Sequence, residues 1–344
     1  MFRPRQAIGV DLGTATVLIY VKGKQIQLRE PSVIAMVRDT GEIKAVGNDA
    51  YAMLGRTPGS IVAVRPMRDG VIADYDLTEK MLKAFVRKVI TGPSRLFKPH
   101  IMVCVPSGVT EVEKLAVLKA VREVGAHRAF LIEEPLAAAI GAGVNIAEPT
   151  GSMIVDIGGG TTDIAVISLG GTVVSESLRI AGNDFDEAII RYIRRKDNLL
   201  IGDRTAEEIK KRVGAALTGR RDDNREIDVR GRDLINGLPK TISVDTNDVV
   251  EALREPLQKI AEGVRRVLEL APPELVSDII DRGIIMTGGG ALLRNFDQLL
   301  RQTTGIPVAV AENATECVAL GTGKALDMIR VLQDALISDL SLRR

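Results

Sequence analysis

The residues best suited to chemistry belong to one short motif that occurs twice in the chain. In each copy an apolar run ends in an aspartate, and glycines follow directly. The copies are residues 10–14 (Val-Asp-Leu-Gly-Thr) and residues 155–162 (Val-Asp-Ile-Gly-Gly-Gly-Thr-Thr). Glycine lets the backbone turn tightly with its N–H groups pointing outward, which suits phosphate oxygens. One copy alone fits a β-hairpin with a glycine turn. Two copies predict a pair of turns that hold a polyphosphate from both sides.

The two aspartates of these motifs predict a metal site. If the turns face each other, Asp11 and Asp156 lie on either side of the phosphates. We expect them to hold Mg²⁺ through its water molecules, because Mg²⁺ gives up its water reluctantly and binds phosphate together with few carboxylates.

A third glycine run, Gly288-Gly289-Gly290-Ala291, follows an apolar stretch that predicts a strand over residues 284–287. Bare glycines permit a flat ring or a sugar to approach closely. A helix is expected to resume here, and its N-terminal N–H groups would attract phosphate. A helix cap without a ligand is the alternative. The chain has neither a Walker loop nor a Rossmann fingerprint, so these turns predict a different kind of nucleotide cleft.

An acidic pair stands before a run of small residues, in the order Glu133-Glu134-Pro135. Proline suits the start of a helix, and small side chains let helices pack closely, which is typical of an interdomain hinge. Glu134 is placed to polarise a water for in-line attack on a γ-phosphate. Capping of the helix by its acidic side chains is the alternative. A second stretch of small residues, 319–325, is the candidate partner helix.

The elements that position these residues alternate between strands and helices, which predicts an α/β fold. Apolar, β-branched runs predict strands over 7–11, 17–21, 32–37, 101–105, 153–156, 164–168 and 284–287. Helical periodicity predicts helices over 78–90, 184–196, 205–217 and 246–270. A capping box, Thr110 with Glu113, predicts a helix that covers a sheet with Leu115, Leu118, Val121 and Val124. Residues 41–66 and 219–232 interrupt the pattern, so each half is expected to carry an insertion.

Composition limits the function classes. The chain has 46 lysines and arginines against 45 aspartates and glutamates, and no tryptophan. A balanced charge and few aromatic side chains argue against nucleic-acid binding. Two cysteines, Cys104 and Cys317, stand in apolar surroundings and are expected to be buried in a reduced compartment. No signal peptide and no transmembrane run is recognisable, so we expect a cytoplasmic protein.

These motifs resemble those of the superfamily of actin, heat-shock chaperones and sugar kinases. Within it the chain resembles the MreB family of bacterial actin homologues. The fuller matches extend over nearly the whole chain and comprise residues 9–15, 30–33, 65–72 and 205–210. The resemblance implies an actin-like (ribonuclease H-like) fold of two duplicated lobes, each with an inserted subdomain, and ATP in the central cleft. The implied parts are a lobe I core (1–32 and 66–145) with insertion 33–65, and a lobe II core (146–181 and 246–344) with insertion 182–245.

The resemblance also implies roles for individual residues. It assigns Asp11 and Asp156 to Mg²⁺, and Glu134 and Thr161 to the attacking water. The residues assigned to the phosphates of ATP or ADP are Gly13, Thr14, Ala15, Thr16, Gly158, Gly159 and Gly160. Those assigned to adenosine are Glu207, Glu208, Ile209, Lys210, Gly288, Gly289, Gly290 and Ala291. The pattern of residues 207–210 alone is typical of a solvated helix face. Thr16 stands where the family usually has Asn, and its hydroxyl has a shorter reach.

A loop over residues 94–99 places Leu96 and Phe97 between Arg95 and Lys98. This composition suits an interfacial membrane anchor that meets anionic lipid, and a loop that packs inward is the alternative. Burial of two such side chains yields about 3–6 kcal/mol, so firm attachment would need repetition along a filament. The resemblance implies such filaments, made of paired antiparallel protofilaments at the inner face of the membrane. It also implies a RodZ-like adaptor and the cell-wall elongation machinery as partners, and a role in rod shape.

Three other functions are weighed against this interpretation. A sugar kinase of the same superfamily would need a catalytic aspartate for a sugar hydroxyl, and none stands out. A chaperone-type ATPase would need a peptide-binding domain after the nucleotide domain. A nucleotide-binding scaffold without hydrolysis stays open because of Thr16.

Overall fold

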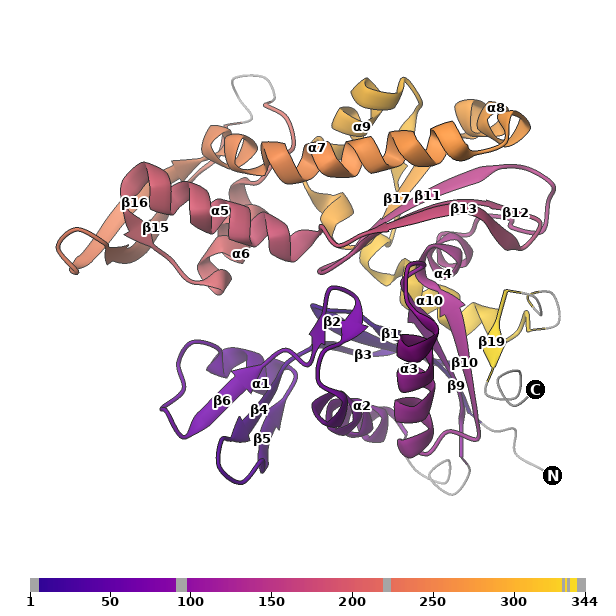
Figure 1. Ribbon diagram of the computed structural model, residues 1–344, viewed down its shortest axis with the longest axis horizontal. Helices are drawn as coiled ribbons and strands as arrows, with labels where there is room; N and C mark the ends of the chain where they lie inside the picture. The colour runs from indigo at the N-terminus through magenta and orange to yellow at the C-terminus, as the bar shows by residue number, and fades with distance from the viewer. Residues whose placement is uncertain (1–5, 91–97, 219–223, 330–331, 333–334, 339–344) are drawn as a thin grey trace.

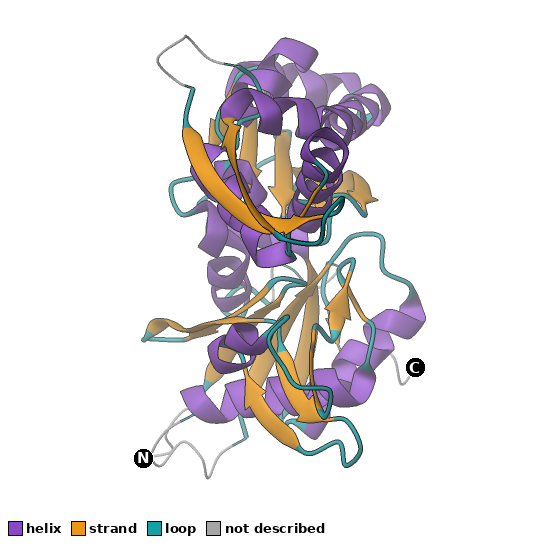
Figure 2. Cartoon of the chain, turned by 90° about the vertical axis from the view of Figure 1, so that its left-hand side faces the viewer, coloured by secondary structure: helices purple, strands orange, loops and turns teal. Residues whose placement is uncertain are grey.

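Two lobes, each built on one mixed sheet, make up the computed structural model of the chain (Figure 1). The structure describes residues 6–90, 98–218, 224–329, 332 and 335–338. Lobe I contains the six-stranded sheet, in the order β19-β10-β9-β1-β2-β3, and lobe II the five-stranded sheet, in the order β13-β12-β11-β17-β18. Seen from the side, the lobes lie one above the other (Figure 2). The strands of the lobe I sheet are β1 (Ala7–Leu12), β2 (Thr16–Val21), β3 (Gln25–Pro31), β9 (His100–Val105), β10 (Arg128–Glu133) and β19 (Ile337–Ser338).

The two sheets share one topology, which accounts for the repeated motif. In lobe I, β1, β2 and β3 form an antiparallel meander, and β9 and β10 continue the sheet in parallel with β1. In lobe II, β11, β12 and β13 form the same meander, and β17 and β18 continue it in parallel. These strands are β11 (Ser152–Ile157), β12 (Thr162–Ser168), β13 (Gly171–Leu178), β17 (Ile284–Thr287) and β18 (Val308–Val310). Each copy of the motif is therefore the first turn of its meander.

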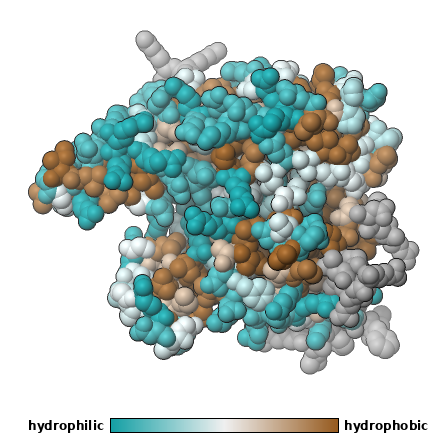
Figure 3. All heavy atoms as spheres, viewed as in Figure 1, coloured by the Kyte–Doolittle hydropathy of each residue, from teal (hydrophilic) through white to brown (hydrophobic). Residues whose placement is uncertain are grey.

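Each lobe also carries a smaller sheet that projects on the same side of the molecule (Figure 1). In lobe I these elements are β4 (Ile34–Val37), β5 (Ile43–Val46), α1 (Asn48–Met53) and β6 (Ile61–Val64), followed by the short pair β7 (Met67–Arg68) and β8 (Val71–Ile72). In lobe II they are α5 (Gly182–Asp197), β14 (Leu199–Leu200), α6 (Asp203–Val213), β15 (Glu226–Asp233) and β16 (Pro239–Asp245). The surface is hollowed between these two projections (Figure 3).

The remaining helices cover the sheets or lie between the lobes. Those that cover sheets are α2 (Tyr75–Val89), α3 (Glu111–Glu123), α7 (Thr246–Leu270), α8 (Pro273–Arg282) and α9 (Phe296–Thr304); α4 (Glu134–Gly141) and α10 (Cys317–Ala325) lie between the lobes. The capping box of α3 is present, since Glu113 N–H donates to Thr110 Oγ1 and Thr110 N–H to Glu113 Oε2. The prediction for its inner face is wrong at Leu115, which is 48% exposed.

A separate hydrophobic core joins the lobes. It combines α4 with side chains from β9 and β10 of lobe I and from β11 and β12 of lobe II, and it includes Val318 and Ala325 of α10. Helices α4 and α10 touch through their backbones, because a Cβ atom on Gly141 would lie 1.8 Å from Cys317 O and one on Gly321 1.7 Å from Ala137 O. Only glycine fits at these two positions. The small residues noted in both segments thus allow a close helix contact between the lobes.

Candidate nucleotide site between the lobes

The two glycine turns meet face to face. Residues 13–15 connect β1 to β2, and residues 158–161 connect β11 to β12. A Cβ atom on Gly159 would lie 2.5 Å from the Cβ of Ala15, and one on Gly160 would lie 2.5 Å from Thr14 Oγ1. A side chain at either glycine would push the turns apart. The structure thus brings both copies of the motif to one place between the lobes.

Other hydrogen bonds hold these turns in position. Thr14 Oγ1 accepts from the backbone N–H of Gly70 at 2.9 Å, and Ser32 Oγ donates to Gly13 O at 2.6 Å. In lobe II the backbone N–H of Gly158 donates to Thr161 O at 2.9 Å, and that of Gly182 donates to Gly158 O at 3.1 Å. The lobe I turn is therefore anchored by Ser32 and Gly70, which lie in two of the segments that resemble the family, and the lobe II turn by its own backbone and by Gly182.

Four carboxylates gather behind the turns. Asp156, Asp163 and Glu134 are buried, and Asp11 is partly buried at the end of β1. Burial raises the pKa of Asp11 and of Asp156 to about 7, and the charges of Asp163 and Asp11 contribute to the raised pKa of Asp156. Burial raises the pKa of Glu134 well above its ordinary value, with further contributions from the charges of Asp163, Asp156 and Asp11. No lysine or arginine of the described residues lowers the pKa of Asp11, Asp156 or Glu134.

The hydrogen bonds to these carboxylates come from neutral donors. Thr287 Oγ1 donates to Asp156 Oδ1 at 2.7 Å, and Cys104 Sγ lies 3.6 Å from Asp11 Oδ1 and 4.0 Å from Glu134 Oε1. Burial and these anionic neighbours raise the pKa of the Cys104 thiol far above its usual range, so it stays protonated. Both cysteines are buried and free, as predicted. The sequence did not reveal that Cys104 lies between two site carboxylates.

A divalent cation bound together with phosphates fits this arrangement. Mg²⁺ usually binds through one or two carboxylates, its own waters and substrate phosphates, without an all-protein cage. Asp11 and Asp156 meet that description because burial raises their pKa, no lysine or arginine of the described residues lowers it, and both lie beside turns that present glycine backbone. Within the described ranges no group of three or more histidine, cysteine or acidic side chains is arranged so that it could hold a metal ion by itself. The donor set therefore suits a metal that arrives with a nucleotide.

The third glycine run packs against Ile157, directly before the second glycine turn. Gly288 has a φ of +80°, and a Cβ atom there would lie 2.3 Å from Ile157 O; one on Gly290 would lie 2.2 Å from Ile157 Cγ2. Gly289 is exposed, and Ala291 is buried. The prediction that a helix resumes directly here is wrong, because residues 290–292 form only a short 3₁₀ helix and α9 begins at Phe296. Gly305 ends α9 with a φ of +75°.

Helix α6 faces the same region from the lobe II projection. Lys210 Nζ donates to Gly182 O at 2.7 Å and pairs with Asp186 at 2.8 Å, so it lies close to the turn that contains Gly158. Glu207 accepts a hydrogen bond from Tyr51 OH of α1 at 2.6 Å, which bridges the two projections. Glu208 is exposed and pairs with Arg212, whereas the side chain of Ile209 lies in the lobe II core. Because its side chain is buried in the core, Ile209 could contact a ligand only through its backbone.

The remaining predicted residues divide into those inside and those outside the described chain. Thr161 is buried, and its methyl group would lie 2.7 Å from a Cβ atom on Gly70. Thr16 begins β2 and pairs with Pro31. Leu96 and Phe97, the predicted membrane anchor, lie outside the described residues. Among the helices that are described, none combines the length and the apolar character needed to span a bilayer.

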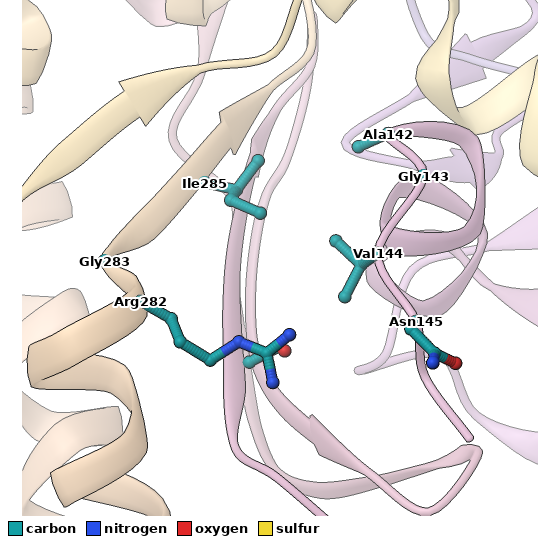
Figure 4. A pocket seen from close by; sticks show the side chains of 8 residues that line it. Ala142, Gly143, Val144, Asn145, Arg282, Gly283 and Ile285 are labelled. Carbon is teal, nitrogen blue, oxygen red and sulfur yellow. The ribbon is translucent and has the colours of Figure 1, made fainter. Parts of the chain in front are cut away.

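A separate pocket of about 330 Å³ lies away from the carboxylates. Residues of the segment after α4, such as Val144 and Asn145, line it on one side, and Arg282, Gly283 and Ile285 line it on the other. The guanidinium group of Arg282 points across the gap towards Val144 and Asn145 (Figure 4). Arg282 also pairs with Glu148. This pocket contains none of the predicted nucleotide residues.

The duplicated sheets, the two facing turns and the interlobe helices define an actin-like protein with a site between its lobes. Solved structures share this architecture. MreB 5 of Spiroplasma citri bound to AMPPNP is similar with a TM-score of 0.91 and 39% identity, covering 97% of this chain and 99% of that one. The MamK double helical filament shares the fold with a TM-score of 0.80 and 24% identity, covering 94% and 99%.

The chain belongs to the MreB/Mbl protein family, whose model matches residues 5–334. It is 54% identical over 336 residues to the cell shape-determining protein MreB of Escherichia coli (strain K12), which covers 96% of each chain. It is also 54% identical over 321 residues to the cell shape-determining protein Mbl of Bacillus subtilis (strain 168), covering 93% of this chain and 95% of that one. The resemblance in the motifs is thereby confirmed for the family and for the actin-like fold.

Proposed function

We propose that this protein binds ATP with Mg²⁺ between its lobes, hydrolyses it, and assembles into filaments that determine cell shape. The observation that carries the proposal is the meeting of two glycine turns beside Asp11 and Asp156, whose pKa burial raises and no cation of the described chain lowers. A nucleotide–metal complex supplies the positive charge that these carboxylates lack and phosphates that fit the turns. Structures of MreB 5 of Spiroplasma citri with AMPPNP and with ADP support the same ligand class.

Each part of the site has a task in this proposal. Asp11 and Asp156 hold the metal through its waters, and bound Mg²⁺ would offset phosphate charge. The phosphates lie against the turns of residues 13–16 and 158–160. Adenosine lies between residues 288–291 and residues 207–210, where Lys210 contacts Gly182 beside the lobe II turn. The chain is divided at 33–65 and 182–245, so that the two smaller sheets are insertions in the lobe cores.

Hydrolysis requires a water aligned with the γ-phosphate and a group that accepts its proton. Glu134 enters from lobe I at the start of α4, and Thr161 enters from lobe II at the end of its turn. The raised pKa of Glu134 fits a carboxyl group that takes up a proton during the reaction. Glu134 also lies in the first turn of α4, where an acidic side chain stabilises the positive end of the helix dipole.

The cellular part of the proposal depends on the family. MreB and Mbl relatives are cell shape-determining proteins, so we infer self-association into paired antiparallel protofilaments at the inner face of the cell membrane. The partners would be a RodZ-like adaptor and the cell-wall elongation machinery. Membership of this family disfavours the sugar kinase and the chaperone-type ATPase.

Two experiments test the proposal. The first compares ATP-dependent phosphate release by the native protein and by Glu134→Ala. Release that falls at least about tenfold supports the water-positioning role, and equal rates would contradict it. The second is sedimentation with ATP, with and without anionic liposomes, followed by electron microscopy. Absence of ATP-dependent filaments would refute assembly, and Leu96→Ser with Phe97→Ser should abolish liposome binding while ATP binding is retained.

A further inference from the structure

Asp163 is the one carboxylate of the cluster that no motif predicted. It lies in β12, opposite Asp156 of β11 and opposite Ser177 of β13, and its exposed fraction is 0%. Asp163 follows the buried Thr162 and precedes four buried apolar residues, 164–167. An apolar side chain would suit this position, because burial of a carboxylate costs several kcal/mol unless it is well paired. The charge is therefore expected to serve a purpose.

The contacts of Asp163 reach both lobes. Its Oδ1 accepts from the backbone N–H of Ser107 at 2.9 Å, and Ser107 belongs to the lobe I loop between β9 and α3. Within lobe II the hydroxyl groups of Ser177 and Thr161 lie close enough to lower the pKa of Asp163, although burial raises it to about 6 overall. Its Oδ2 has no regular hydrogen-bond partner among the described residues, and neither does the buried Oγ of Ser107. One carboxyl group thus connects the Thr161 turn to the opposite lobe and keeps one oxygen available.

The two residues proposed to align the water come from different lobes. Glu134 belongs to lobe I and Thr161 to lobe II, so their distance depends on how the lobes close. Asp163 is two residues from Thr161 and is the charged neighbour that affects Glu134 most. The bond from Ser107 to Asp163 therefore ties the lobes together directly beside this pair.

We propose that Asp163 is a positioning residue for ATP hydrolysis: it orients the Thr161 hydroxyl and joins lobe II to Ser107, so that Thr161 and Glu134 align the attacking water only in the closed cleft. This role rests on the hydrolysis proposed above. It assigns Asp163 to the chemical step and not to nucleotide affinity, because its contacts are to Thr161, Ser177 and Ser107.

A purely structural role is the alternative, and a second contact between the lobes provides a matched control. Thr172 Oγ1 of β13 donates to Glu133 Oε2 at 2.8 Å, next in sequence to Glu134. Thr172→Ala removes one interlobe hydrogen bond without touching Thr161. If Asp163 only held the lobes together, the two sites should behave alike.

The test measures kcat and KM for ATP, the Kd for AMPPNP and the thermal unfolding of the native protein, Asp163→Asn, Asp163→Ala and Thr172→Ala. Asn keeps a carbonyl oxygen for Ser107 N–H but presents an amide donor in place of a carboxylate oxygen. We expect Asp163→Asn to lower kcat about tenfold or more, with a Kd for AMPPNP within about threefold of native. Asp163→Ala should lower kcat at least as far, and Thr172→Ala should keep kcat within about twofold.

The outcomes separate this inference from the proposed function. Native kcat in Asp163→Asn would overturn the positioning role while leaving hydrolysis intact. An equal loss of kcat in Thr172→Ala, or a loss confined to KM and Kd, would also overturn it, because a general loosening of the lobes would then explain the effect. No hydrolysis by the native protein, despite AMPPNP binding, would overturn the proposed ATPase activity and this role with it.

Discussion

Replacement of Asp156 by asparagine should stabilise the nucleotide-free protein at neutral and alkaline pH. Asp156 is buried, and burial together with the charges of Asp163 and Asp11 raises its pKa from 3.8 to about 7. Asn has nearly the same shape, and its carbonyl oxygen can still accept the hydrogen bond from Thr287 Oγ1. The substitution therefore removes the charge and preserves the packing.

The magnitude follows from linkage. In the folded protein the carboxyl group stays protonated up to about pH 7, whereas in the unfolded chain it ionises near 3.8. The folded state thus binds more protons between these values, so the free energy of unfolding falls as the pH rises from about 4 to about 7. A shift of about 3 pKa units corresponds to about 4 kcal/mol at most. Asp156→Asn should recover a large part of this energy at pH 8 and almost none at pH 4.

The assay is denaturant unfolding of both proteins at pH 4, 6 and 8 without nucleotide, repeated with Mg²⁺ and AMPPNP. Native protein should gain stability from the ligand at pH 8, and Asp156→Asn should gain less because it binds the metal–nucleotide complex more weakly. A matched pH dependence in the two proteins would show that Asp156 is not the group that titrates. Undiminished stabilisation by the ligand in the variant would refute its place at the metal.

Three further predictions concern the contacts around the site. Gly321→Ala places a Cβ atom 1.7 Å from Ala137 O, so it should lower the free energy of unfolding by about 1–3 kcal/mol or more. Gly171→Ala is the control, because the space around Gly171 is open. It should change the free energy of unfolding by less than about 1 kcal/mol in the same denaturant assay. Tyr51→Phe removes the hydrogen bond to Glu207 across the cleft and should weaken AMPPNP binding by about 2- to 10-fold in a calorimetric titration; a native Kd would show that this bond does not support the closed form. Lys210→Met leaves the largely buried Asp186 without its ion-pair partner and should destabilise the protein by about 1–3 kcal/mol, compared with less than about 1 kcal/mol for Lys259→Met at an exposed pair.

Local sequence patterns were enough to predict helix α7 and the strands that precede the glycine turns. Helix α7 begins at Thr246 and ends at Leu270 as its periodicity indicated, because the side chain of Asp245 caps it and its apolar stripe is continuous. The strand over residues 284–287 was also correct. Of the strands before the two turns, β1 is one residue longer than predicted at its end, and β11 is one residue longer at each end. An apolar run that ends in Asp and Gly is typical of a buried strand followed by a turn, so these strands could be recognised.

The lobe II hairpin of β15 and β16 could not be predicted in the same way. Both strands lie in a small sheet and bury few side chains, and their alternation of apolar and polar residues is short, with Ile227 and Val229 in β15 and Ile242 and Val244 in β16. Charge-rich residues 219–232 indicated only an interruption. Residues such as Val229 and Val244, which do pack inward, are too few to define a register from sequence alone.

The sequence did not predict Tyr51, Ser107 and Asp163 as site residues, because their partners are distant in sequence. Tyr51 meets Glu207 across 156 residues, and Ser107 meets Asp163 across 56. No local periodicity contains such information. One signal was available for Asp163, because a charged residue directly before the apolar stretch of residues 164–167 is unusual in a strand that is buried on both faces.

The distribution of these contacts explains how a nucleotide can control the relative position of the lobes. On the hinge side, α4 and α10 touch through glycine backbones within an apolar core. A small rotation of one lobe against the other can leave this core buried. On the cleft side the lobes meet through individual hydrogen bonds: Tyr51 to Glu207, Arg65 to Asn183, Thr172 to Glu133 and Ser107 to Asp163. Each is worth about 0.5–1.5 kcal/mol net, so opening the cleft costs only a few kcal/mol. A ligand that binds both glycine turns needs a differential affinity of the same size to shift the population between open and closed forms.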